Sequence, residues 1–380
     1  MQGKLNGKTL NASLTFCIHL KELHTIDILS LTPEALAKVM ADLSHPSYRA
    51  EQIFRWLHQT HVTSFADMKN IPKSLQESLA KKFHIPTVEP VGKQVSIKDG
   101  TVKYLFGFDD NTTLIESVLM QYNHGYSLCI STQAGCRMGC TFCASAETGL
   151  VRHLTAGEML AQVYGTNKDC GKVSNIVLMG CGEPLDNYDE TIRFLHLVNH
   201  PKGLNIGQRH ITLSTCGLVP EIYKLANLKP QFNLAISLHA PTDEIRKILM
   251  PIAKAYPITD LIKACRHYSE ATHRRITFEY ALAKGVNDSA LQAKELSRLL
   301  KGLNCHVNII PINKASGGFT PTPRQNIEAF ANILKENNIQ TTIRRSLGSD
   351  VAAACGQLRA KHIQKQITHN SISSPPHQYP

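Results

Sequence analysis

Three cysteines crowd into one short stretch, GCRMGCTFCASAETG, at Cys136, Cys140 and Cys143. A closed structural zinc site needs four ligands, usually cysteine and histidine at finger-like spacings. Only His153 offers a fourth ligand in the residues just downstream, so the spacing disfavours such a site. Three thiolates leave one metal position open for chemistry. An iron–sulfur cluster fits this pattern best, because thiolates are the usual ligands of such clusters.

The elements that must position this loop alternate regularly. Apolar stretches with strand character recur from residue 128 onward, and helical patterns follow most of them. This alternation predicts a parallel sheet, and about six such units predict a complete or partial α/β barrel. Ligand residues of such a barrel lie just after the carboxyl ends of its strands. The predicted strands are 128–131, 175–179, 210–214, 233–237, 275–280, 307–311 and 341–345.

Several of these strands are followed by residues suited to ligand binding. Gly182 lets the backbone approach a ligand, and the neighbouring Glu183 can accept a hydrogen bond from an ammonium group. Each signal is weak alone, because polar residues often end strands. On successive strands they predict a ring of ligand groups beside the cysteines. The ring consists of Gly182, Glu183, Ser214, Ser237, Leu238, His239 and Asn313.

The rest of the chain divides into three further parts. Residues 25–94 show apolar side chains at helical spacing, with Thr32 and Pro33 at a helix start, and predict a small helical accessory domain. The core is predicted to span 95–360, and its first strands are expected at 102–108 and 113–120. Residues 1–24 are expected to be an N-terminal extension, and 361–380 a disordered tail.

Composition narrows the class of protein. The chain has 380 residues, of which 42% are hydrophobic and 19% charged, as in ordinary globular proteins. No apolar run approaches a membrane span and no signal peptide is evident, so a cytoplasmic protein without a membrane partner is expected. Eleven scattered cysteines then indicate metal ligation or catalysis rather than structural disulfides. The net charge of +11 fits either a solvated basic surface or a polyanionic partner.

The cysteine loop resembles that of the radical S-adenosylmethionine (SAM) superfamily, whose hallmark is CxxxCxxC after the first barrel strand. The resemblance implies a [4Fe–4S] cluster bound by Cys136, Cys140 and Cys143, with SAM on the open iron. Cleavage of SAM there yields a 5′-deoxyadenosyl radical. The expected fold class is therefore α/β, a partial (β/α)6-type radical SAM barrel with a small N-terminal helical accessory domain.

Longer runs are similar to the RlmN family of dual-specificity RNA methyltransferases, with the Cfr proteins as close relatives. One departure is Cys181, which stands where the family usually has the methionine of GMGEP. The matching runs are YRAEQIFRWL, CISTQAGCRMGCTFCAS, GCGEPLDNY, SLHAPTDEIRKILMPI, GVND, HVNIIPIN and TIRRSLGSDVAAACGQL.

This resemblance implies catalytic roles for Cys355, Glu116 and Cys129. Taken alone, both cysteines are equally explained as small buried side chains. In the family's chemistry, Cys355 takes a methyl group from a first SAM, and the radical from a second SAM abstracts hydrogen from that methyl. The resulting carbon radical adds to C2 of an adenine. Glu116 then takes the proton from the adduct, and Cys129 attacks Cys355 to release the product, leaving a transient disulfide.

The substrates implied are 23S rRNA and an adenosine in the tRNA anticodon loop, with an electron donor such as flavodoxin and a monomeric enzyme. The accessory domain would bind RNA, and the target base must leave its stack. A Cfr-type enzyme would use the same machinery at C8. The sequence 182–185 and the lack of an extra cysteine at Ala134 favour C2.

Two more distant alternatives also stay open. A radical SAM enzyme acting on a small molecule or peptide would leave Cys129, Cys355 and the basic charge unexplained. A zinc-stabilised RNA-binding module would be colourless and would contain no iron.

Overall fold

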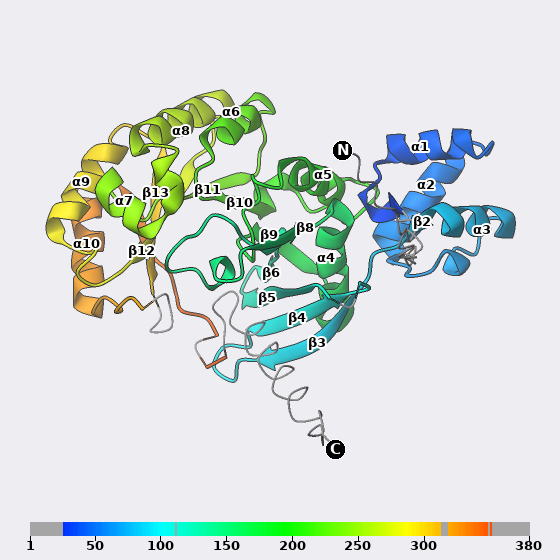
Figure 1. Ribbon diagram of the computed structural model, residues 1–380, viewed down its shortest axis with the longest axis horizontal. Helices are drawn as coiled ribbons and strands as arrows, with labels where there is room; N and C mark the ends of the chain where they lie inside the picture. The colour runs from blue at the N-terminus through cyan, green and yellow to red at the C-terminus, as the bar shows by residue number, and fades with distance from the viewer. Residues whose placement is uncertain (1–25, 111, 313–317, 349, 352–380) are drawn as a thin grey trace, which may run out of the picture.

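A curved sheet with helices on its outer face forms the larger part of the molecule, and a helical lobe stands at one end (Figure 1). The computed structural model describes residues 26–110, 112–312, 318–348 and 350–351. Within them, ten strands form the main sheet in the order β14-β13-β12-β11-β10-β9-β6-β5-β4-β3. Strands β6 and β9 to β14 run parallel, whereas β3, β4 and β5 form an antiparallel extension beside β6.

The predicted partial (β/α)6 barrel is confirmed, with β14 as a seventh parallel strand. The strands of the sheet are β3 (Val88–Val95), β4 (Val102–Phe108), β5 (Leu114–Tyr122), β6 (Gly125–Cys129), β9 (Val173–Leu178), β10 (Ile211–Thr215), β11 (Asn233–Ser237), β12 (Ile276–Leu282), β13 (Cys305–Pro311) and β14 (Gln340–Ile343). The helices of this part are α4 (Ala156–Cys170), α5 (Tyr188–Asn199), α6 (Val219–Asn227), α7 (Asp243–Leu249), α8 (Ile258–Thr272), α9 (Ala290–Leu300) and α10 (Arg324–Glu336).

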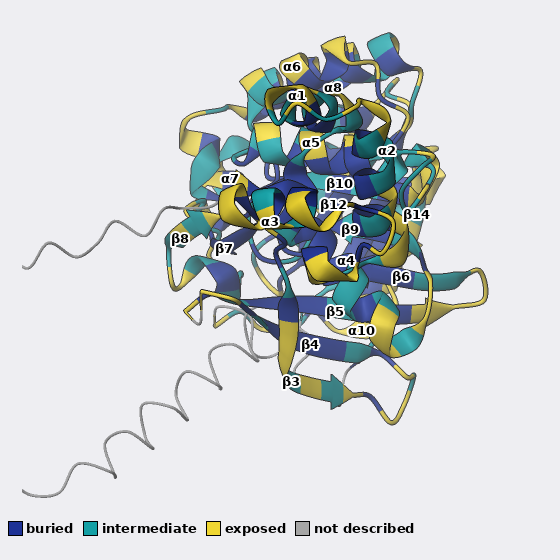
Figure 2. Cartoon of the chain, turned by 90° about the vertical axis from the view of Figure 1, so that its right-hand side faces the viewer, coloured by how far each residue is buried: buried dark blue, intermediate teal, exposed yellow. Residues whose placement is uncertain are grey.

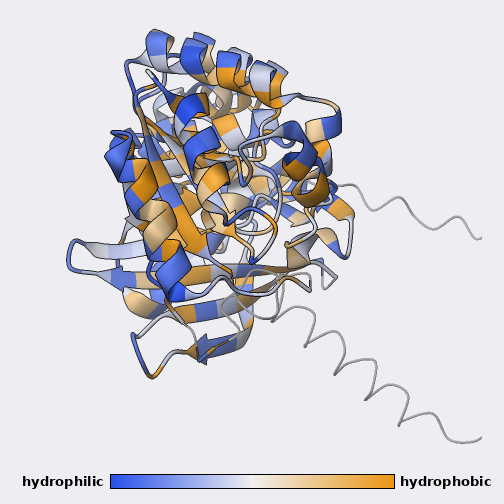
Figure 3. Cartoon of the chain, turned by 90° about the vertical axis from the view of Figure 1, so that its left-hand side faces the viewer, coloured by the Kyte–Doolittle hydropathy of each residue, from blue (hydrophilic) through white to orange (hydrophobic). Residues whose placement is uncertain are grey.

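The helices are placed by local signals and by amphipathic packing. Thr155 and Glu158 form the predicted capping box at the start of α4. Helix α9 begins with a second one, between Ser289 and Gln292. The helices carry hydrophilic residues on their outer surfaces, while the strands behind them are largely apolar (Figure 3). The apolar faces of the helices therefore bury against the sheet.

Most predicted strands are shifted at their ends by one or two residues, and two differences have a clear physical reason. Strand β6 ends at Cys129 rather than 131, because the chain then turns and the backbone N–H of Ser131 donates to Gln162 Oε1. Strand β3 belongs to the sheet although the boundary of the accessory domain was predicted at residue 94. The strand is a mostly exposed edge containing Pro90 and Lys93, so it lacks the apolar alternation that marks a buried strand.

The helical lobe consists of α1 (Pro33–Asp42), α2 (Tyr48–Arg55) and α3 (Lys73–Lys82), with a short parallel pair of β1 (Ile26–Asp27) and β2 (Phe83–His84). Thr32 caps α1 as predicted. The lobe contacts α4 through a hydrogen bond between His58 Nδ1 and Tyr164 Oη at 2.7 Å. Its interior is buried while its outer turns are exposed (Figure 2). The lobe is thus attached to the barrel through an interface of its own.

Candidate functional site

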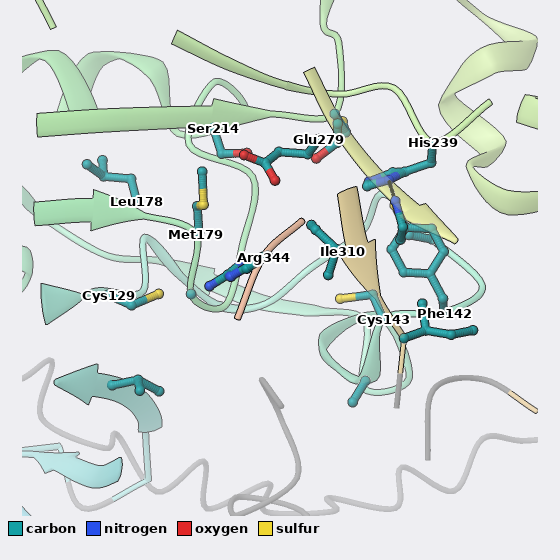
Figure 4. A pocket seen from close by; sticks show the side chains of 18 of the residues that line it. Cys129, Phe142, Cys143, Leu178, Met179, Ser214, His239, Glu279, Ile310 and Arg344 are labelled. Carbon is teal, nitrogen blue, oxygen red and sulfur yellow. Dashed lines mark hydrogen bonds between the residues drawn. The ribbon is translucent and has the colours of Figure 1, made fainter. Parts of the chain in front are cut away.

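A cavity of about 410 Å³ lies where the parallel strands end, and its size suits a small-molecule ligand. Side chains from seven strands and from the cysteine loop reach it (Figure 4). The described residues that line it include Thr101, Val118, Met120, Cys129, Cys136, Cys140, Phe142, Cys143, Met179, Gly182, Glu183, Ser214, Cys216, Ser237, His239, Glu279, Ile312, Arg344 and Leu347.

The cysteine loop is held at its base and at its tip. It runs between β7 (Gln133–Gly135) and β8 (Leu150–His153), which pair antiparallel. Gly135 has a φ of 81°, and a Cβ there would collide with the Gly149 carbonyl. That carbonyl accepts a hydrogen bond from the Cys136 N–H at 2.9 Å. At the tip, the Thr141 N–H donates to the Leu249 carbonyl of α7 at 3.0 Å.

The three predicted ligand thiols, Cys136, Cys140 and Cys143, all line the cavity. Burial raises the pKa of Cys136 and Cys140 to about 12, and Cys143 raises both further through its charge. The three sulfurs therefore lie within electrostatic reach of one another. A ligand that binds here must displace protons from these thiols.

The donor set fits a cluster better than a single ion. Among the described residues, no three His, Cys, Asp or Glu side chains could hold one metal ion. A [4Fe–4S] cluster gives each cysteine its own iron, so the three sulfurs need not converge on one point. Three thiols on one cavity wall meet that requirement.

Glu183 is a buried link between two strand ends as well as a wall of the cavity. Its carboxylate accepts from the Cys216 N–H at 2.7 Å and from the Leu185 N–H at 3.1 Å. Burial raises its pKa, and the hydrogen bond from Cys216 opposes that rise. Gly182 has a φ of 109°, and a Cβ there would come within 2.7 Å of the Gln133 side chain. Only glycine lets this turn pack so closely.

The next strands place Ser214, Ser237 and His239 on the cavity, whereas the Leu238 side chain is fully buried in the core. His239 Nδ1 accepts from the Ala281 N–H at 2.9 Å, so the proton lies on Nε2. Burial lowers the pKa of His239 to about 3. The ring is therefore neutral near pH 7.

The antiparallel extension forms the opposite side of the cavity. Cys129 ends β6 and lies across the cavity from Cys143 (Figure 4). Glu116 is not a lining residue, but it shares a face of β5 with the lining residues Val118 and Met120. Its carboxylate pairs with Lys103 Nζ at 3.0 Å, and both side chains are almost fully buried.

Two predicted residues, Asn313 and Cys355, lie outside the described residues. The chain is nevertheless held just before Cys355. Asp350 accepts hydrogen bonds from Ser96 Oγ at 2.6 Å and from the Ile97 N–H at 2.9 Å. The turn between β3 and β4 thus holds the chain at Asp350.

Sequence reasoning missed Glu279 and assigned no site role to Arg344, and both line the cavity. Glu279 extends from β12 and accepts from Asn308 Nδ2 at 2.9 Å. Burial raises its pKa, and the charge of Arg344 opposes that rise. A glutamate inside an otherwise apolar strand was a signal available in the sequence. Arg344 follows β14, and its sequence signals were its place in the run TIRRSLGSDVAAACGQL and the adjacent basic residue Arg345.

Two family models match the chain. The model described as "Radical SAM superfamily" matches residues 130–296. The model described as "Ribosomal RNA large subunit methyltransferase N-terminal domain" matches residues 26–85, which is the helical lobe. The two matches divide the chain much as the lobe and the barrel do.

Curated relatives match over almost their full length. A protein of Alkaliphilus oremlandii (strain OhILAs), named "Probable dual-specificity RNA methyltransferase RlmN", is 53% identical over 89% of this chain and 99% of its own. A protein of the same name from Geobacillus kaustophilus (strain HTA426) is 54% identical over 89% and 94%. The crystal structure of a radical SAM methyltransferase from Sphaerobacter thermophilus covers 87% of this chain and 98% of its own, with a TM-score of 0.82 and 43% identity.

Proposed function

Because the chain belongs to the RlmN family of radical SAM RNA methyltransferases, we propose that it methylates C2 of adenine in 23S rRNA and in tRNA anticodon loops. The observation that carries this proposal is a single cavity lined by the three cysteines of the loop and by Cys129. The relatives' name, "dual-specificity RNA methyltransferase", supports two kinds of RNA substrate. The findings favour this C2 function over the Cfr-type C8 alternative.

In this proposal, Cys136, Cys140 and Cys143 bind a [4Fe–4S] cluster, and the ring of strand-end residues binds SAM. Bound together, these groups supply a 5′-deoxyadenosyl radical. Gly182 and Glu183 would approach the methionine part of SAM, as their place beside the cysteine loop supports. Ser214, Ser237, Leu238, His239 and Asn313 would contact the remainder, Leu238 through its backbone. Two SAM molecules would be used per turnover.

The methyl group would travel on Cys355. Val351 is four residues before Cys355, and the anchoring of Asp350 holds this part of the chain beside the cavity. Four extended residues span at most about 14 Å, which limits how far Cys355 can lie from Val351. Cys129 would attack the sulfur of Cys355 to release the product. Glu116 would accept the proton from C2, and its buried pairing with Lys103 supports this role by holding its carboxyl group in place beside the strand residues that line the cavity.

The target adenine must leave its stack to enter the cavity. The net charge of +11 supports binding of an RNA backbone, and the match of the lobe to an rRNA methyltransferase domain supports RNA binding by the lobe. No helix among the described residues has the length and apolar character to cross a membrane. The electron donor, such as flavodoxin, the monomeric state and the cytoplasmic location stay predictions.

Nucleoside mass spectrometry tests the proposal. RNA would be taken from a strain lacking its own C2 methyltransferase, with and without this gene. We expect 2-methyladenosine in rRNA and in tRNA only when the gene is present. Cys355→Ala is the matched control and should yield none. Finding 8-methyladenosine instead would place the enzyme with the Cfr proteins, and finding neither from protein with an intact cluster would overturn the proposed substrate.

A further inference from the structure

Arg246 of α7 carries a guanidinium that is fully buried, yet none of the salt bridges between described residues includes it. Its Nη2 donates to the Cys216 carbonyl at 2.7 Å. Its Nε and Nη1 are buried without any hydrogen-bond partner. An arginine stays protonated even in an interior, so a buried positive charge without an ion-pair partner lies here, and the charge of Asp243 acts on it only from beyond ion-pair distance. A buried charge of this kind is stabilised by a nearby negative group.

The surroundings of Arg246 point to the cysteine loop. Leu249, one turn further along the same helix, accepts the hydrogen bond from Thr141, which follows Cys140. Cys140 and Cys216 both pack in a small apolar cluster that includes Leu249. The charge of Arg246 lowers the pKa of both thiols, against the larger rise that burial causes. The guanidinium is therefore electrostatically coupled to a proposed cluster ligand.

Arg246 lies outside the cavity, behind residues that line it. Cys140 and Cys216 line the cavity, whereas Arg246 is not among its described lining residues. A ligand inside the cavity would therefore meet Cys140 directly, whereas the Arg246 guanidinium is buried outside the cavity, against the Cys216 carbonyl. This separates Arg246 from the residues proposed to touch SAM. Its route of action is through the loop.

We propose that Arg246 compensates the charge of the cluster and favours its reduced state. This inference rests on the proposed [4Fe–4S] cluster. Three thiolates and a cluster core of charge 2+ give a net charge of −1, and uptake of one electron makes it −2. A fixed positive charge behind Cys140 stabilises the −2 state more than the −1 state.

Arg246→Gln removes the charge but keeps a donor for the Cys216 carbonyl, and Arg246→Lys keeps the charge. The full chain, reconstituted anaerobically with iron and sulfide, would be titrated electrochemically and followed by electron paramagnetic resonance, without RNA. At the wild-type midpoint potential we expect the ratio of reduced to oxidised cluster to fall roughly tenfold or more in Arg246→Gln, as for removal of a nearby unit charge. Arg246→Lys should stay close to wild type.

Arg274→Gln is the matched control. Arg274 also has a buried Nε without a partner. It donates to Asn233 at the start of β11, so it lies at the opposite end of the parallel strands from the cavity. Its midpoint potential should equal that of wild type. An Arg246→Gln protein with a full cluster and an unchanged potential would overturn the inference, because it would leave Arg246 a purely structural link to Cys216.

If Arg246→Gln fails to take up iron, the inference can be tested by spectroscopy of the wild-type cluster. Protein with arginine labelled by ¹⁵N in its guanidinium should show a weak nitrogen coupling to the reduced cluster in pulsed spectra. Part of this coupling should be lost in Arg246→Lys, because the arginines that line the cavity, Arg344 and Arg345, are labelled as well. Identical couplings in wild type and Arg246→Lys would overturn the inference. A wild-type cluster with no RNA methylation would refute the proposed function alone, whereas a wild-type protein that binds no iron would refute both.

Discussion

The cavity has two walls that differ in origin. The cluster wall consists of Cys136, Cys140, Cys143, Glu183, Cys216 and His239, all within the residues that the radical SAM model matches. The hairpin wall consists of Thr101, Val118, Met120 and Cys129, backed by Glu116 and Lys103, and all of these precede that match. The proposed radical chemistry therefore belongs to the residues that the radical SAM model matches, whereas Cys129 and Glu116, with their proposed roles in product release, lie on strands that precede the match.

The walls also differ in how they are held. Backbone hydrogen bonds fix the cluster wall, among them those from Cys136 to Gly149 and from Cys216 to Glu183. The hairpin wall is held by the antiparallel pairing of β4, β5 and β6, and it also contains a buried ion pair, whose desolvation is costly and whose geometry must be kept. Substitutions on the cluster wall should therefore lower iron content, whereas substitutions on the hairpin wall should lower stability and turnover.

The largest effect is expected on the cluster wall. Cys140→Ala removes one of three proposed ligands, so the iron content should fall sharply and RNA methylation should become undetectable. Iron analysis and absorbance after anaerobic purification measure this directly. Cys265→Ala is the matched control, since Cys265 is a buried cysteine on α8 that does not line the cavity. Full iron loading and activity in Cys140→Ala would contradict the assignment of Cys140 as a cluster ligand.

A smaller effect is expected from Lys103→Met on the hairpin wall. The change leaves the Glu116 carboxylate buried without its partner, which should cost roughly 3–5 kcal/mol of stability. Turnover should fall by about 100-fold, as for a displaced proton acceptor, while iron content stays at the wild-type level. Urea unfolding and single-turnover assays measure the two quantities.

The double variant Lys103→Met with Glu116→Gln separates structure from chemistry. A neutral amide needs no counter-charge, so stability should recover, but turnover should not. Recovery of turnover together with stability would show that the ion pair has only a structural role.

The smallest effect concerns acid stability, and it compares the cavity with the lobe. Burial lowers the pKa of His239 and of His58 to about 3, from an ordinary value of 6.5. Between these values the unfolded chain binds the protons and the folded one does not, so stability is complete above pH 6.5 and falls as the pH drops. Each histidine should contribute a slope of about 1.4 kcal/mol per pH unit.

In His58→Gln, the free energy of unfolding should fall less steeply with decreasing pH, by the slope of about one proton. Iron content should not change, because His58 lies in the lobe. Urea unfolding at pH 7, 6 and 5 measures the two slopes. Parallel slopes in wild type and variant would contradict the buried neutral state of His58.

The sequence was most informative where local signals and periodicity agree. The capping box at Thr155 and the apolar strands of the barrel were predictable because each depends on neighbouring residues. Strand β3 was missed because an exposed edge carries no apolar alternation. The partner of Glu116 was also hidden, since pairing Lys103 with it requires the register of β4 against β5. Arg246 looked like one more charge on a helix, because only the tertiary structure shows that it is buried.

The most direct test of the division between the walls is Cys129→Ala. The purified variant should keep a full cluster and should still cleave SAM, but it should release no methylated RNA. Mass spectrometry of tryptic and nuclease digests should instead find a nucleotide joined covalently to Cys355. Release of 2-methyladenosine at the wild-type rate would contradict the account, and so would free, unmodified RNA without any adduct from a fully loaded variant.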